Sequence, residues 1–163
     1  MFFRLFLFVL ILALGYALET WDLEHTHFQE PWNTVLAFLA EQGIQFFHGS
    51  VKRLGNQLTD PGTGKTIVVL AGCNGFEVTF MLLTAVGVYP SCFRAKLIGM
   101  LVGFLAVQSL NVLRVACLYY LNLWDEEMFR IAHLYVWQSL IMLDVLVILM
   151  LWLRWQHSLC IKA

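Results

Sequence analysis

The sequence predicts an all-α membrane protein of about four transmembrane helices, with an extracytoplasmic amphipathic helix and a short β-hairpin. Two observations lead to this fold class. Hydrophobic residues make up 60% of the 163 residues and charged residues only 13%, whereas soluble domains are about 45–50% apolar and about 25% charged. Four long apolar segments also follow one another along the chain, each close to the ~20 residues that a spanning helix needs.

This composition excludes several classes of protein. A soluble domain of this size has too little interior to bury so much apolar surface. Disorder needs low hydrophobicity and a high net charge, but the mean hydropathy is +0.74 and the formal net charge is −1. A nucleic-acid-binding protein would show a basic patch or stripe, and 10 basic residues against 11 acidic ones do not give one. The expected partner is the lipid bilayer, with no nucleic acid.

The four predicted spans cover about residues 2–18, 73–90, 97–121 and 132–153, in a single integral membrane domain of residues 1–163. The third span would reach ~37 Å at 1.5 Å per residue, which is enough to cross a bilayer with tilt. The first segment has an alternative as a cleaved signal peptide, because it carries one basic residue before a short apolar run. No clean A-x-A site follows it, so we favour a retained helix.

Charge sets the predicted orientation. Short cytoplasmic loops carry an excess of lysine and arginine. Three clusters are basic without any acidic residue: Arg4, then Arg94 with Lys96, then Arg154 with Lys162. Four spans with both termini inside put every one of these clusters in the cytoplasm, and they put segment 19–72 outside.

The extracytoplasmic segment is predicted to hold two elements. Residues 31–48 carry apolar residues at helical spacing, interrupted by polar ones such as Glu41; this pattern favours a helix lying on the membrane surface over a fifth span. Within 49–72, Asp-Pro-Gly at 60–62 predicts a turn. The β-branched run at 66–69 favours a strand, so we expect a short hairpin leading into the second span.

Two further patterns carry little weight. The sequence Gly-Thr-Gly-Lys-Thr at 62–66 resembles the end of a P-loop, but Thr59 stands where that motif needs its first glycine. His25, His27 and His48 fall on the outer segment as candidate metal ligands, although histidines on a wet loop are more often solvated. We therefore expect no metal and no cofactor.

Among the four cysteines, Cys73 has the most informative setting. No two cysteines form C-x-x-C, so the spacing does not support a zinc or redox pair. Cys92 and Cys160 are predicted to face the cytoplasm, and Cys117 lies inside the third span. Cys73 lies in Gly-Cys-Asn-Gly at 72–75, where glycines let the backbone turn and a helix N-terminus stabilises a thiolate. A glycine-rich turn with an incidental cysteine is an equally good interpretation of this motif alone.

Arg114 lies inside the third predicted span. An ionisable residue at mid-helix costs at least ~2.5–3.5 kcal/mol on insertion scales, which makes it a functional candidate by default. Asn111 precedes it by three residues and shares its helix face. The alternative is a structural ion pair with Glu77 or Asp144, the role that we favour for these carboxylates.

His133 opens the fourth span, directly after the acidic outer loop. On the predicted topology Cys73, Arg114 and His133 all face the outer leaflet. Together they offer a nucleophile, a fixed cation that stabilises a developing oxyanion, and a titrating base that also protonates a leaving amine.

These motifs, in this order, resemble the exosortase/archaeosortase family of membrane transpeptidases. The short length, the outer amphipathic segment and the hairpin look most like its exosortase H type. The resemblance covers about residues 72–153 and rests on Gly-Cys-Asn-Gly, on Asn111-x-x-Arg114 and on His133. It implies that Cys73 is the nucleophile, Arg114 the transition-state stabiliser and His133 the acid/base. We expect the supporting residues to be Asn74, Glu77 and Asn111. Family members usually have more spans, so this chain is a minimal version.

The resemblance also implies a function. The substrates would be secreted proteins with a C-terminal sorting tail made of a short motif, a membrane span and a basic end. The enzyme would be a cysteine-dependent peptidase or transpeptidase that cleaves this tail through a thioester and passes the protein to an acceptor that the sequence does not identify. Its place would be the bacterial inner membrane, with the active site facing the periplasm.

Three other functions compete with this one. A membrane thiol oxidoreductase would need a cysteine pair on the outer face, where Cys73 stands alone. A metal or haem protein would use the outer histidines or inward-facing pairs within spans. A non-enzymatic membrane assembly protein would tolerate alanine at Cys73, Arg114 and His133.

Overall fold

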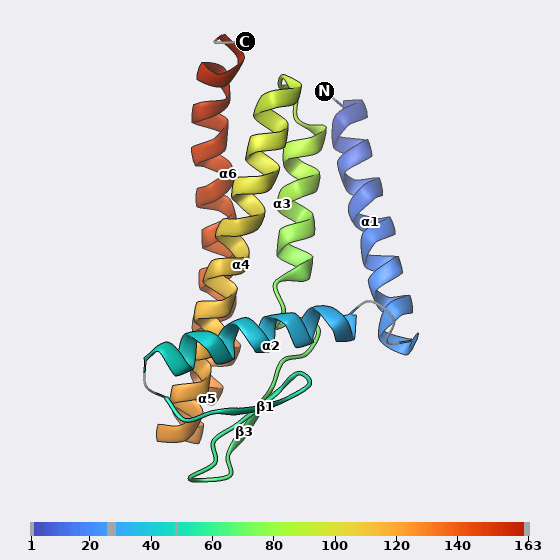
Figure 1. Ribbon diagram of the computed structural model, residues 1–163. Helices are drawn as coiled ribbons and strands as arrows, with labels where there is room; N and C mark the ends of the chain where they lie inside the picture. The colour runs from blue at the N-terminus through green and yellow to red at the C-terminus, as the bar shows by residue number, and fades with distance from the viewer. Residues whose placement is uncertain (1, 26–28, 48, 162–163) are drawn as a thin grey trace.

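The computed structural model describes residues 2–25, 29–47 and 49–161 (Figure 1). Four long helical rods, α1 (Phe2–His25), α3 (Phe76–Val88), α4 (Phe93–Trp124) and α6 (Trp137–Ile161), run side by side. A fifth helix, α2 (Gln29–Phe46), lies across one end of this bundle. The small sheet lies at that same end, and both chain termini lie at the other (Figure 1).

Three helical stretches are long and apolar enough to cross a membrane: Phe2–Trp21, Phe93–Trp124 and Glu126–Cys160. The predicted all-α membrane class is therefore confirmed. The second predicted span is shorter than expected, because α3 has 13 residues and rises only ~20 Å against a hydrocarbon core of ~30 Å. It begins at Phe76 and not at residue 73, since Gly72 and Gly75 have positive φ and interrupt the helix.

The third and fourth predicted spans also have different ends. The third begins at Phe93 and continues to Trp124. The fourth begins well before residue 132, with helix α5 (Glu126–Ile131) and a π-helical turn, η1 (Ala132–Val136), running directly into α6. The acidic stretch predicted as a loop is therefore the first turn of a helix, where carboxylates are favourable.

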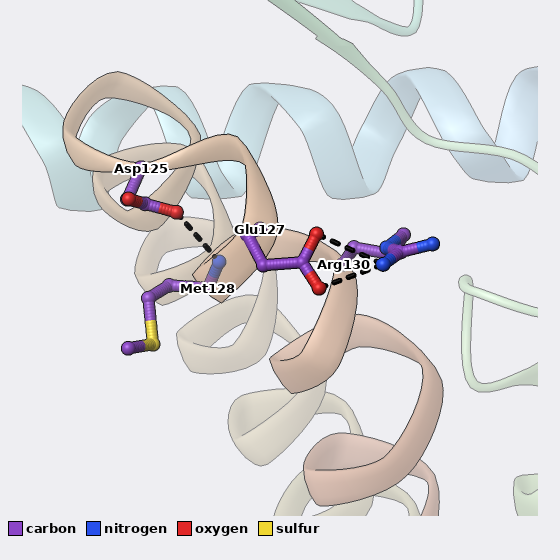
Figure 2. A network of polar contacts seen from close by, with 4 residues as sticks. All are labelled: Asp125, Glu127, Met128 and Arg130. Atoms are coloured by element: carbon purple, nitrogen blue, oxygen red, sulfur yellow. Dashed lines mark hydrogen bonds and ion pairs between the residues drawn. The ribbon is translucent and has the colours of Figure 1, made fainter.

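Figure 2 shows how that helix begins. Asp125 is the N-cap of α5 and accepts a hydrogen bond from the Met128 backbone N–H at 2.9 Å. Arg130 donates to both carboxylate oxygens of Glu127, at 2.7 and 2.9 Å. The ion pair is well exposed and adds little stability, so the cap is the feature that defines where the helix carrying His133 starts.

The predicted amphipathic helix forms as α2, two residues earlier than expected. Its buried face carries Leu36, Ala37, Ala40 and Ile44. These residues form one core cluster with the sheet residues Val51, Leu58, Ile67 and Val69 and with Val115 and Tyr119 of α4. Phe38 and Leu39 are exposed, which leaves a second apolar face for the membrane surface.

The predicted hairpin is a three-stranded antiparallel sheet in the order β1 (Lys52–Leu54), β2 (Gln57–Thr59), β3 (Thr66–Val68). The turn at 60–62 occurs as expected, and the Asp60 carboxylate accepts hydrogen bonds from the backbone N–H and hydroxyl of Thr63 at 2.7 and 2.8 Å. Lys65 of the P-loop-like stretch donates to the carbonyls of Asn122 and Leu123, at 2.7 and 3.2 Å. It therefore caps the C-terminus of α4, where a cation is favourable.

A disulfide joins Cys92 to Cys160 across 68 residues, with Cα atoms 5.8 Å apart. It connects the start of α4 to the end of α6, at the end of the bundle that holds the termini (Figure 1). The sequence spacing gave no sign of this pair. Cys73 and Cys117 are free.

Candidate functional site

Cys73 lies in the turn between β3 and α3, outside the helix. Gly72 and Gly75 flank it with φ of +79° and +67°, a region of backbone space that glycine enters at little cost. The Cys73 backbone N–H donates to the Leu70 carbonyl at 3.0 Å. The side chain is half-buried, so the glycines fold the chain around a thiol that stays partly accessible.

The structure brings Cys73, Arg114 and His133 together from three elements. The Cys73 Sγ lies 3.6 Å from His133 Nε2, within reach for a thiol–imidazole hydrogen bond. Arg114 Nη2 lies 4.0 Å from the same sulfur. The turn supplies the thiol, α4 the guanidinium and η1 the imidazole.

His133 sits in the π-helical turn η1. Such single-turn π segments are rare and are often found at functional sites. Its ring stacks on Phe129 with 5.7 Å between ring centres, while its Nδ1 is buried without a hydrogen-bond partner among the described residues. The stacking fixes the ring plane, and Nε2 is the nitrogen that faces Cys73.

Arg114 is buried, with 2% of its surface exposed. The structural ion pair expected from the sequence is wrong: no salt bridge joins Arg114 to Glu77 or Asp144. Glu77 is exposed in the first turn of α3. The guanidinium instead lies beside the Cys73 sulfur, with Nη2 4.0 Å from it.

These surroundings act on the Cys73 thiol in opposite directions. Burial is the largest effect and raises its pKa above the ordinary thiol value, because desolvation disfavours the thiolate. The positive charge of Arg114 lowers the pKa, and the negative charge of Glu77 raises it. The net direction is upward, so the neutral thiol beside a base is the resting form.

Asn74 holds the turn in place from within the protein. It is fully buried, and its amide donates to Gln29 Oε1 at 2.5 Å and to Asn33 Oδ1 at 2.9 Å. Its own Oδ1 accepts from the Phe76 backbone N–H at 3.0 Å. Trp32 Nε1 donates to the Asn74 carbonyl at 3.3 Å. One face of α2 thus holds Asn74, the residue next to Cys73, through three hydrogen bonds.

The sequence alone did not indicate that the site includes Gln29, Trp32 and Asn33. Their spacing of three and four residues places them on one helix face, and polar residues on the buried side of an amphipathic helix were the available signal. The sequence could not show that these residues bind Asn74, because the contacts join residues 41 to 45 positions apart.

Asn111 is also fully buried, and it packs under the turn. A Cβ atom on Gly75 would lie 3.1 Å from its amide group, so the close approach needs glycine there. Neither amide atom of Asn111 has a partner in the described part of the chain. Next to it, Gln108 Nε2 donates to the Thr79 hydroxyl at 2.8 Å and to the Gly75 carbonyl at 3.4 Å.

The described residues contain no group of three metal-ligating side chains. Of the three histidines considered as ligands, His27 and His48 lie outside the described residues, as does the side chain of His25.

Fold and site together define an integral membrane protein with a cysteine, histidine and arginine cluster where the short sheet meets the bundle. A family model described as transmembrane exosortase (Exosortase_EpsH) matches residues 1–154, and the chain belongs to this family. The match confirms the family resemblance drawn from the sequence and extends it to the N-terminal helices. No curated protein and no solved structure matches the chain.

Proposed function

We propose that this chain is a membrane-embedded cysteine transpeptidase. It cleaves the C-terminal sorting tail of secreted proteins through a thioester at Cys73 and transfers the protein to an acceptor. The observation that carries the proposal is the placement of one thiol within 3.6 Å of an imidazole and 4.0 Å of a buried guanidinium. This set matches the needs of acyl transfer: a nucleophile, a base and a cation for the oxyanion.

The chemistry follows from the three side chains. His133 Nε2 takes the proton of the Cys73 thiol as the sulfur bonds to a substrate peptide carbonyl carbon. The carbonyl electron pair moves to oxygen, beside the Arg114 guanidinium. When the tetrahedral intermediate collapses, the C–N bond breaks, the leaving amine takes the proton from His133, and a thioester remains. An acceptor nucleophile or water then attacks the thioester, gives its proton to His133, and releases the sulfur, which is reprotonated.

In the proposed orientation the protein lies in a bacterial inner membrane with Cys73 facing the periplasm. The basic clusters support this orientation. Arg94 and Lys96 begin α4, Arg154 lies near the end of α6, and Arg4 begins α1, all at the end of the bundle away from the sheet (Figure 1). By the positive-inside tendency that end is cytoplasmic.

A thiol oxidoreductase is less well supported. Cys92 and Cys160 form a disulfide, but it lies at the far end of the bundle from Cys73. Cys73 has no cysteine partner, so the pair that thiol exchange needs is absent from the site.

The proposal is tested in cells that secrete a protein with a sorting tail. Cys73→Ala should abolish tail removal, because the sulfur forms the covalent intermediate. Cys117→Ala is the matched control, since Cys117 is the other free cysteine of the described residues, and this variant should process the tail normally. Mass spectrometry of the secreted protein gives the cut site and any attached group. Tail removal by Cys73→Ala at the wild-type rate would refute the proposal.

A further inference from the structure

A small hollow lies beside the nucleophile, between the start of α3 and Arg114. Its volume is about 30 Å³, which is enough room to hold a water molecule. Gly72, Asn74 and Gly75 line it from the turn, and Phe76, Glu77 and Val78 line it from the first turn of α3. Arg114, Gln138, Ile141 and Met142 complete the wall. A hollow of this size fits a single oxygen atom of a substrate.

Two backbone N–H groups of residues that line the hollow have no hydrogen-bond acceptor in the described part of the chain. The first N–H groups of an α-helix have no acceptor within the helix. Here the Phe76 N–H is taken by Asn74 Oδ1, and the Thr79 N–H by the Gly75 carbonyl. For the N–H groups of Glu77 and Val78, the described residues supply no acceptor. Both belong to the N-terminus of a 13-residue helix, which favours a negative charge.

A second, independent feature of the wall also points to an anion. Arg114 is 2% exposed, and its Nε is buried without a hydrogen-bond partner in the part of the chain that the structure describes. A buried cation with an unused donor is costly unless a ligand satisfies it. Its Nη2 meanwhile lies 4.0 Å from the Cys73 sulfur, so the same side chain borders both the nucleophile and the hollow.

We infer that this hollow is the oxyanion hole of the enzyme, formed by the backbone N–H groups of Glu77 and Val78 together with the Arg114 guanidinium. The inference rests on the proposed function, and it adds the backbone N–H groups that stabilise the oxyanion together with Arg114. As the Cys73 sulfur bonds to the carbonyl carbon and its proton passes to His133, the carbonyl oxygen gains the electron pair and lies in the hollow. It returns the pair when the C–N bond breaks and the thioester forms.

The inference also explains the turn. Two glycines of positive φ let the chain reverse between Cys73 and α3, so that the neighbours of Cys73 in the turn and the N-terminus of α3 line one small hollow. Fixed donors aimed at a developing charge lower the barrier most where water is excluded. The negative charge of the exposed Glu77 carboxylate disfavours an anion in the hollow. The backbone N–H of the same residue stabilises that anion.

The test removes one backbone donor. Glu77→Pro deletes an N–H at the second helical position, where proline is tolerated because the first turn needs no such donor. Glu77→Gln keeps the N–H and removes the charge, so its acyl-transfer rate is the reference. We expect the rate of acyl-enzyme formation on a synthetic tailed peptide to fall about 100-fold in Glu77→Pro relative to Glu77→Gln. Val78→Pro, compared with Val78→Ala, should show the same loss.

A second reaction separates chemistry from collapse of the turn. Iodoacetamide alkylates the Cys73 thiolate by direct displacement, with no carbonyl oxygen to stabilise. In both proline variants we expect alkylation to stay within about threefold of its reference variant while acyl transfer falls. Unchanged acyl transfer, or equal losses in both reactions for both variants, would overturn the inference. If wild-type protein forms no acyl-enzyme at all, the proposed function itself is wrong.

Discussion

In the proposed function, Cys73, Arg114 and His133 carry the chemistry, and the distances between them describe the site before substrate binds. The thiol and imidazole lie 3.6 Å apart, and burial raises the pKa of the thiol. The neutral thiol is therefore the expected form of Cys73 before substrate arrives. Catalytic contacts often shorten only once substrate is bound, which fits separations of 3.6 and 4.0 Å from the sulfur.

The Cys73 pKa gives a pH prediction at the residue scale. Because the pKa is raised, alkylation by iodoacetamide should increase with pH and reach half its maximum above the pH typical of free cysteine. Arg114→Gln should move this midpoint to higher pH, since it removes the charge that lowers the pKa. Glu77→Gln should move it to lower pH, since it removes the charge that raises it.

These midpoints are measured from alkylation rates across the pH range, in a Cys117→Ala background so that Cys73 is the free thiol under observation. Shifts of the same sign in both variants would contradict the assigned roles of the two charges.

At the scale of elements, α2 and the turn that carries Cys73 are joined by hydrogen bonds to Asn74. Asn33→Ala removes an acceptor from the buried Asn74 amide, and an unsatisfied buried donor costs about 1–3 kcal/mol. We expect a lower unfolding temperature in detergent and weaker acyl transfer, because the turn that carries Cys73 loses an anchor. Gln45→Ala, on the exposed side of the same helix, is the control. Equal unfolding temperatures and equal acyl-transfer rates in the two variants would show that the hydrogen bond between Asn33 and Asn74 does not support the turn.

The sequence predicted most elements but missed several of their ends. Apolar periodicity located the helices, and Asp-Pro-Gly located a turn. The start of α3 was missed because only the backbone angles of Gly72 and Gly75 show where the helix is interrupted. The start of α5 was missed because Asp125 was interpreted as a loop residue, although it is a helix cap.

For the molecule as a whole, the sequence placed Cys73, Arg114 and His133 at one depth, and the structure brings them into contact. Hydrophobic segments and charged loops were sufficient for that placement. Contacts between residues far apart in the sequence were not predictable. Neither the hydrogen bonds from α2 to Asn74 nor the Cys92–Cys160 disulfide follows from the spacing of residues along the chain. The P-loop-like lysine proved to cap α4.

Orientation is testable at the same scale. Disulfides are typical of oxidising compartments, yet the Cys92–Cys160 bond lies at the end that the basic clusters assign to the cytoplasm. The disulfide and the basic clusters thus indicate opposite sides of the membrane for this end of the bundle, and labelling of single-cysteine variants distinguishes between the two orientations. A membrane-impermeant maleimide added to intact spheroplasts should label Leu54→Cys in the sheet, and should label Ser158→Cys only after permeabilisation. The reverse pattern would place Cys73 on the cytoplasmic side and remove the basis for a periplasmic substrate.

The most direct test of the central claim is the intact mass of the purified protein after brief reaction with a peptide that carries a sorting tail. The proposed function predicts a mass increase equal to the acyl part of the peptide, located on Cys73 and released by hydroxylamine as a thioester is. Cleaved peptide without any adduct on Cys73 would contradict it.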